Sequence, residues 1–194
     1  GTFVRHIDES STGLQSLVTS EALFGKTLTG STWIQRDQEV TDIYDVMYSP
    51  DGDLYTKNDS FILYSQNNGE TFTVIDWPSG TFPPYDGTNL YVLDDDVLFI
   101  NDFLGYCYYS INNGQSWQLG GQLFLSIETV ARMVDDFIYL ADPSSIGAGI
   151  IARINVSTGQ LEIIDILRLA IPYDPIYCQI IEDGTVYMLG IDPS

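Results

Sequence analysis

The chain has 194 residues, 44% of them hydrophobic and 13% aromatic, which is enough for a packed core and too apolar for a disordered protein. Its 27 acidic residues outnumber its 7 basic residues and give a formal net charge of −20, so nucleic acid is a poor partner because phosphate groups are repelled. The apolar runs fall far short of the roughly 20 residues of a membrane span, so we expect no membrane insertion.

Two patterns share the N-terminal region. Leu14, Leu17, Val18 and Leu23 recur at helical spacing after a Ser/Thr-rich segment, which indicates either a short lid helix or an irregular strand. The segment 24–36, which contains GKTLTGSTWIQ, then has the pattern of two strands joined by a turn. It lacks an evident partner strand nearby in the sequence.

A nine-residue pattern occurs twice in the middle of the chain. YSQNNGETF occupies 64–72 and YSINNGQSW occupies 109–117. Asn-Gly between apolar runs is a strong hairpin signal, because both residues tolerate a positive φ angle. We therefore expect a turn with a strand on either side at both places.

The repeat extends over most of the chain. The aligned turns end at steps of 39, 45 and 45 residues, at Trp33, Phe72, Trp117 and Glu162. A second marker, an aromatic residue in an aliphatic strand after an acidic or glycine turn, recurs at intervals of 44, 40 and 48 residues, at Tyr55, Phe99, Tyr139 and Tyr187. Periods of 40 to 50 residues with several short strands per unit are typical of propeller blades.

These units predict a single all-β domain over 1–194, a β-propeller of about four blades made of four-stranded antiparallel sheets. The predicted blades are 43–76, 90–119, 130–166, and 176–191 combined with 24–36. In this interpretation the N- and C-terminal strands share one blade and close the ring, which removes exposed sheet edges. The alternative is that these blades belong to a larger ring whose remainder lies outside this chain.

The two turns resemble the Asp-box, or BNR repeat, a hairpin found in sialidases, sortilin-type receptors and many secreted or viral β-propellers. The matching residues are Ser65, Asn67, Gly69, Thr71 and Phe72, and Ser110, Asn112, Gly114, Ser116 and Trp117. Asn67 and Asn112 replace the usual Asp, and an Asn side chain can still cap its own turn. The resemblance implies a structural device on the blade rim and no particular activity.

Arg132 is a candidate binding residue. Alignment of the predicted inner strands on their turns places it beside apolar or aromatic equivalents, Tyr48, Val92 and Ile180. A guanidinium in a propeller channel could hold an anionic ligand, because its planar fork binds carboxylate or phosphate through two hydrogen bonds. The competing interpretation is a structural ion pair with an acidic residue of a neighbouring blade.

The connection 76–87, DWPSGTFPPYDG, is the second candidate. It carries Trp77, Phe82 and Tyr85 among several prolines, and loops that expose aromatic residues are common contact sites. The competing interpretation is that these aromatic residues fill the space between two blades.

Acidic residues gather at the predicted turns between first and second strands, where they could serve glycoside hydrolysis or attract calcium. They are Asp94, Asp95, Asp96, Asp135, Asp136, Glu182 and Asp183. Asp is also ordinary turn chemistry, and the chain has no calcium-loop motif. Cys107, Cys178 and His6 are too few and too scattered for a zinc site or a disulfide framework. We therefore expect no cofactor, no metal and no catalytic residues.

The expected function is that of a noncatalytic binding or structural module, extracellular or virion-associated, such as a tail or capsid decoration that recognises a host. A protein or glycan partner within a larger assembly fits this expectation. The alternative is a subdomain of a sialidase-like glycoside hydrolase, which needs three arginines converging on the ligand carboxylate. The acidity indicates either a protein adapted to a high-salt host or simple solubility.

Overall fold

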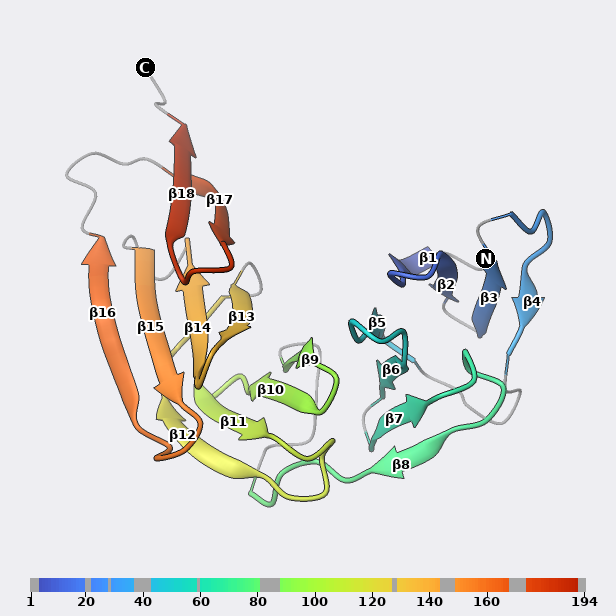
Figure 1. Cartoon of the computed structure of the whole chain (residues 1–194), viewed down its shortest axis with the longest axis horizontal. Helices are drawn as coiled ribbons and strands as arrows, with labels where there is room; N and C mark the ends of the chain where they lie inside the picture. The colour runs from blue at the N-terminus through green and yellow to red at the C-terminus, as the bar shows by residue number, and fades with distance from the viewer. Residues whose placement is uncertain are drawn as a thin grey trace.

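The computed structural model describes residues 4–19, 22–27, 29–36, 43–58, 60–80, 88–126, 129–143, 149–167 and 174–191. Within these ranges every regular element is a β-strand, the strands form five antiparallel sheets, and no helix is long and apolar enough to cross a membrane. The sheets stand side by side along an open arc, with the first strand of each sheet on its inner side (Figure 1). The predicted all-β class is confirmed.

Strand order within each sheet follows chain order. The first sheet contains β1 (Val4–Glu9), β2 (Leu14–Thr19), β3 (Leu23–Thr27) and β4 (Ile34–Gln35). The second contains β5 (Asp45–Tyr48), β6 (Leu54–Lys57), β7 (Ile62–Ser65) and β8 (Thr73–Ile75). The third contains β9 (Asn89–Asp94), β10 (Val97–Asn101), β11 (Tyr106–Ser110) and β12 (Gln118–Gln122). The fourth contains β13 (Val130–Val134), β14 (Phe137–Asp142), β15 (Gly149–Asn155) and β16 (Leu161–Leu167). The fifth contains β17 (Asp174–Ile180) and β18 (Val186–Ile191).

The repeats found in the sequence correspond to whole sheets. The units at 43–76, 90–119 and 130–166 coincide with the second, third and fourth sheets to within three residues at each end. Apolar side chains on both faces of these sheets explain why their strands form, since each four-stranded sheet is covered by its neighbours along the arc. The middle strands are accordingly the most buried, and four of the five residues of β10 are almost inaccessible.

The N-terminal prediction needs correction. The segment 24–36 does not complete a blade with 176–191, because β3 and β4 pair with β1 and β2, while β17 and β18 form a separate two-stranded sheet. The lid helix is absent as well, since the residues at helical spacing lie on β2 and β3. A tight turn decides the outcome: Gly13 has φ of 79°, which reverses the chain between β1 and β2.

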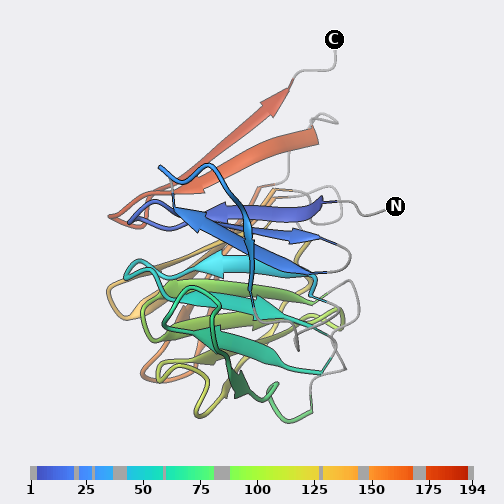
Figure 2. The ribbon, with the colours of Figure 1, turned by 90° about the vertical axis from the view of Figure 1, so that its right-hand side faces the viewer.

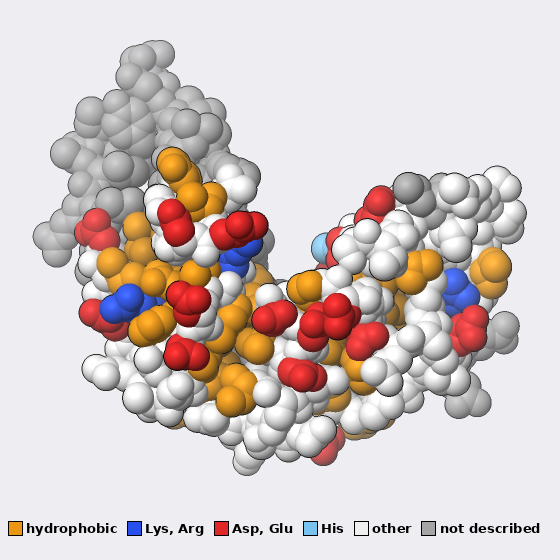
Figure 3. All heavy atoms as spheres, viewed as in Figure 1, with side chains coloured by type: hydrophobic (Ala, Val, Ile, Leu, Met, Phe, Trp, Pro, Cys, Tyr) orange, Lys and Arg blue, Asp and Glu red, His pale blue; other side chains and the backbone are white. Residues whose placement is uncertain are grey.

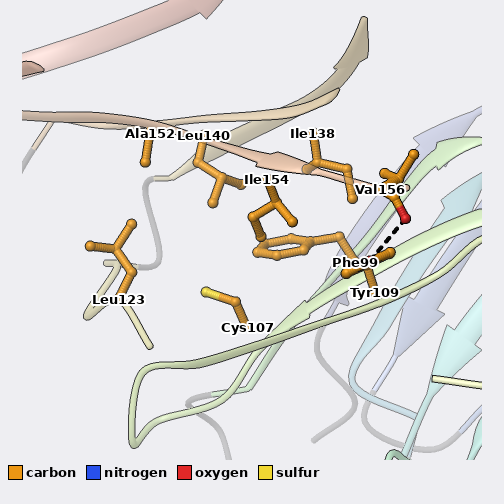
Figure 4. Close-up of a cluster of buried hydrophobic side chains, with 9 residues drawn as sticks. All are labelled: Phe99, Cys107, Tyr109, Leu123, Ile138, Leu140, Ala152, Ile154 and Val156. Carbon is orange, nitrogen blue, oxygen red and sulfur yellow. Dashed lines mark hydrogen bonds between the residues drawn. The ribbon is translucent and has the colours of Figure 1, made fainter. Parts of the chain in front are cut away.

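The core is divided into clusters between adjacent sheets. One cluster lies between the third and fourth sheets, where side chains from both point toward each other (Figure 4); its residues are Phe99, Cys107, Tyr109, Leu123, Ile138, Leu140, Ala152, Ile154 and Val156. The Tyr109 hydroxyl donates a hydrogen bond to the Val156 carbonyl oxygen at 3.0 Å across this boundary. Each sheet is therefore stabilised mainly by the sheets beside it.

Candidate functional site

The two repeated turns have the same hydrogen bonds. In the first, Ser65 Oγ accepts from the Gly69 amide at 2.8 Å, and Asn67 Oδ1 accepts from the Thr71 amide at 3.0 Å. The second turn reproduces both bonds with Ser110 and Asn112, at 2.8 and 3.0 Å. The central residues have positive φ angles, as the Asn-Gly pairs predict: Asn68, Gly69, Asn113 and Gly114.

These turns fasten each sheet to the one before it. A Cβ atom built on Gly114 would lie 2.3 Å from Ile75 Cγ2, so the turn of the third sheet rests directly on β8. Trp117 Nε1 donates to the Asp76 carbonyl oxygen at 3.1 Å in the same direction. Phe72 packs in the same way on the core cluster between the first two sheets. The turns thus have a structural role at the outer rim.

A second set of turns, those that follow the first strand of each sheet, forms one end of the molecule. Seen from the side, the β1–β2, β5–β6 and β17–β18 turns lie at the same end of their sheets (Figure 2). We call this end the turn face, and define it by residues 10–13, 49–53, 94–96, 135–136 and 181–185.

Neighbouring turns on this face are hydrogen-bonded to one another. Ser11 Oγ donates to the Pro50 carbonyl oxygen at 2.7 Å, and the Asp51 amide donates to Asp95 Oδ1 at 3.0 Å. The Tyr55 hydroxyl donates to Asn113 Oδ1 at 2.9 Å and to the Asp95 carbonyl oxygen at 3.2 Å. The turns of the first three sheets therefore form a continuous and pre-organised surface.

The turn face is strongly acidic. Acidic side chains gather along the inner part of the arc (Figure 3). The pKa of the Asp51 carboxyl is raised above its ordinary value, first by a hydrogen bond with the Asp95 side chain and then by the charge of that carboxylate, with smaller contributions from Asp53 and Asp94. Carboxylates that repel one another in this way favour a cationic neighbour.

Arg132 lies on β13 at the edge of the turn face. Its Nη1 donates to the Ile180 carbonyl oxygen at 3.0 Å, and its Nη2 lies 3.9 Å from Glu182 Oε1, in a pocket of about 490 Å³. The predicted alignment was off by one position, because the turns differ in length. In the fourth sheet, Arg132 on the first strand pairs with the aromatic marker of the second strand. The residues that pair with this marker in the second, third and fifth sheets are Met47, Tyr91 and Gln179, so these are the equivalents of Arg132. A one-residue shift of this kind changes the face of the sheet.

The other described arginines each engage a different part of the surface. Arg5 donates to the Ile43 carbonyl oxygen, Arg36 lies 3.9 Å from Glu70, and Arg153 contacts Glu162 at 2.8 Å while its guanidinium lies over the Phe137 ring. Arg168 lies outside the described residues. The described arginines thus hold the structure at separate places rather than converging on one ligand carboxylate.

Trp77 is the part of the predicted aromatic loop that the structure describes; Phe82 and Tyr85 lie outside the described residues. Its side chain is half-buried against the core cluster of the second and third sheets, and it lines a pocket with Trp117. No pattern in the sequence indicated this pairing, since the two tryptophans are 40 positions apart. Trp77 is therefore neither a freely exposed contact residue nor a fully buried one.

The cysteines and the acidic residues form no reactive or metal-binding cluster among the described residues. Cys107 and Cys178 are free and buried, and burial raises the pKa of the Cys107 thiol to about 12, so that it stays protonated and unreactive. Among the described residues, no group of three or more His, Cys, Asp or Glu side chains is arranged to hold a metal ion.

Comparison with known proteins resolves the fold. No family model and no curated protein matches the sequence. Solved structures do match: the GH74 enzyme of Niastella koreensis (TM-score 0.66, 16% identity, 98% of this chain and 33% of that chain), the WD40 domain of SCAP from fission yeast (0.66, 13%, 96% and 51%) and YCF48 from Cyanidioschyzon merolae (0.54, 14%, 84% and 56%). The fold is that of a β-propeller. The chain spans less than two thirds of the length of each of these neighbours.

Proposed function

We propose that this propeller chain is a noncatalytic binding or structural module that recognises a protein or peptide partner through its turn face. The observation that carries the proposal is the hydrogen-bonded row of acidic turns, fixed by the Ser11–Pro50 and Asp51–Asp95 contacts. A surface held in place before binding loses little conformational entropy when a partner docks. Its negative charge complements a basic partner surface and would speed the encounter.

Peptide recognition is compatible with the fold. A neighbour at 15% identity and a TM-score of 0.58 was solved as YCF48 bound to D1 peptide, so that propeller accommodates a peptide. We extend the proposal to an extracellular or virion-associated setting within a larger assembly, where an acidic surface keeps the module hydrated and soluble. Labelling of intact particles or cells with an antibody against this chain would test that location.

A charge-neutralised variant tests the turn face. Asp135→Asn with Asp136→Asn removes two turn-face charges, and both residues are exposed in the turn between β13 and β14. Glu70→Gln with Asp165→Asn is the matched control, because it removes the same charge from the rim. The probe is a fluorescent peptide of alternating lysine and glycine, titrated at about 0.02 M and about 0.15 M salt.

We expect the turn-face variant to bind the peptide several-fold more weakly than the parent, and the control variant to bind as the parent does. Equal weakening in both variants would show that the peptide senses net charge alone and would contradict a turn-face site. Release of reducing sugar from a glycan by the parent protein would instead favour the glycoside hydrolase alternative.

A further inference from the structure

A pocket of about 430 Å³ lies at the outer rim, between the second and third sheets. One wall is formed by β8 and the residues that follow it, and the other by the turn between β11 and β12. Its lining includes the side chains of Tyr64, Thr73, Asp76, Trp77, Gln115 and Trp117. Its volume lies within the range of small-molecule pockets, which runs from about 300 to about 1,000 Å³.

The lining combines aromatic rings with uncharged polar groups. Two indoles and a phenol lie beside a hydroxyl, two amides and one carboxylate, and the residues that line the pocket include no lysine or arginine. Aromatic rings offer flat apolar surfaces, while amide and hydroxyl groups fix the orientation of a polar ligand. This mixture suits a molecule with one apolar face and a polar edge.

The walls of the pocket are held in place by contacts between the two sheets. Trp117 Nε1 donates to the Asp76 carbonyl oxygen at 3.1 Å, and Gly114 rests on Ile75. The Tyr64 hydroxyl donates to Asp53 Oδ2 at 2.5 Å, which fixes its ring. The pocket is therefore formed before any ligand arrives, which reduces the entropy lost on binding.

Trp77 lines the pocket with its ring and not with its N–H group. Its Nε1 atom is buried, so a ligand in the pocket cannot reach this donor.

We propose that this pocket binds a neutral pyranose ring of a glycan, whose apolar face stacks on the indoles and whose hydroxyls bond to Gln115 and Thr73. Charge favours a neutral ligand, because Asp76 and the net charge of −20 repel anionic sugars. The site lies at the rim, away from the inner part of the turn face, and does not depend on the function proposed above.

The test uses the parent protein and uncharged trisaccharides: cellotriose, maltotriose and chitotriose. Binding is measured by saturation-transfer NMR and by tryptophan fluorescence, with sialyllactose as the anionic comparison. We expect at least one neutral trisaccharide to bind with Kd on the order of 1 mM, and sialyllactose to bind at least about tenfold more weakly.

Two variants and a control assign the site. Trp77→Ala removes a stacking surface, and Gln115→Trp fills the pocket from an exposed position without touching the core. Both should weaken binding at least about tenfold. Trp33→Ala is the control, because Trp33 is a partly exposed tryptophan at the equivalent repeat position and lies outside this pocket. It should bind as the parent does.

Three results would overturn the proposal. The first is that none of the neutral trisaccharides binds at about 10 mM. The second is that Gln115→Trp binds like the parent while Trp77→Ala loses both binding and thermal stability, since Trp77 would then be structural only. The third is that the parent binds a proline-rich peptide and no sugar, and that Gln115→Trp abolishes binding of the peptide. None of these results affects the Asp135/Asp136 test, so failure here is distinguishable from failure of the proposed turn face.

Discussion

His6 Nδ1 lies 2.8 Å from Asp45 Oδ1, and this pair joins β1 to β5 at the boundary between the first two sheets. The hydrogen bond with Asp45 raises the pKa of His6 above its ordinary value of 6.5, against the opposing effect of burial. Burial favours the neutral form of Asp45, but the hydrogen bond and the charge of His6 outweigh it and lower the pKa of Asp45 below 3.8. His6 is the single histidine of the chain, so its titration can be followed without overlap.

The first prediction is a pH-dependent stability that His6→Gln removes. A raised folded-state pKa contributes stability that is complete below 6.5 and lost as the pH rises through the folded value. The lowered pKa of Asp45 contributes stability above 3.8 that is lost as the pH falls through its folded value. The difference in unfolding free energy between the parent and the variant should therefore be largest between about pH 4 and pH 6.5 and should shrink by pH 8.

The size of this effect is limited by solvent. The His6 side chain is 40% exposed, so the pair should contribute no more than about 1 kcal/mol. Urea denaturation at pH 5, 6, 7 and 8 measures the unfolding free energy of the parent and of His6→Gln. The difference between the two values at each pH removes the pH dependence that general charge repulsion causes in both proteins. A difference that is constant across this range would contradict the assigned ion pair.

The second prediction concerns Gly114. Alanine there is strained by φ of 75° and also collides with Ile75, so it should destabilise the fold by about 1–3 kcal/mol more than strain alone. Gly80→Ala isolates the strain, because Gly80 has φ of 91° and nothing within 4 Å of the added carbon. Urea denaturation of both variants gives the comparison. Similar losses in the two would show that the turn does not press on β8.

A double variant sharpens this result. Ile75→Ala removes the methyl group that an alanine at position 114 would meet. If the collision is the cause, the two substitutions together should cost less than the sum of the single changes. Additive losses would assign the effect to the backbone of the turn.

The sequence predicted much of the fold because the signals were local. Asn68, Gly69, Asn113 and Gly114 set their own backbone conformation, so the turn chemistry and the repeat period located the second, third and fourth sheets. The first sheet was not predicted as a unit, because the spacing of Leu14, Leu17 and Val18 left a lid helix and an irregular strand open and 24–36 was assigned to a blade with 176–191. In the structure that turn pairs β1 with β2, and the same leucines lie on a strand.

The candidate site was less predictable because it depends on contacts between sheets. The acidic turns were visible in the sequence, but the bond between Asp51 and Asp95 joins residues 44 positions apart. The meeting of Trp77 and Trp117 likewise requires β8 to lie against the next turn. No propensity or spacing rule encodes how one blade packs on another, so such pairs follow only from the assembled fold.

The third prediction tests the tyrosine hydroxyls that join neighbouring sheets. Tyr55→Phe keeps the buried ring and removes the bonds to Asn113 and Asp95, and Tyr109→Phe removes the bonds to Gln118 and Val156. Each should lower the unfolding free energy by about 1 kcal/mol, because the Val156 carbonyl is buried and the other acceptors are partly buried when they lose their donor.

Tyr187→Phe is the control for these two variants, since Tyr187 is 58% exposed. It should change the unfolding free energy by less than about 0.5 kcal/mol. Chemical denaturation of the three variants under one condition makes the comparison. Losses at Tyr55 and Tyr109 as small as that at Tyr187 would show that the hydroxyls do not join the sheets.

The last prediction concerns salt. With a net charge of −20, the folded chain repels itself, and the turn face concentrates this repulsion where Asp51 and Asp95 meet. The repulsion between charges extends over a Debye length of about 30 Å at 0.01 M salt and of only about 3 Å at 1 M, so added NaCl should raise the melting temperature steeply over this range.

The Asp135→Asn/Asp136→Asn variant should start from a higher melting temperature at low salt and gain less from NaCl. The Glu70→Gln/Asp165→Asn control carries the same net charge, so a smaller change there would place the repulsion on the turn face. A melting temperature that stays flat between low and molar salt would remove the adaptation to high salt and leave solubility as the explanation of the acidity.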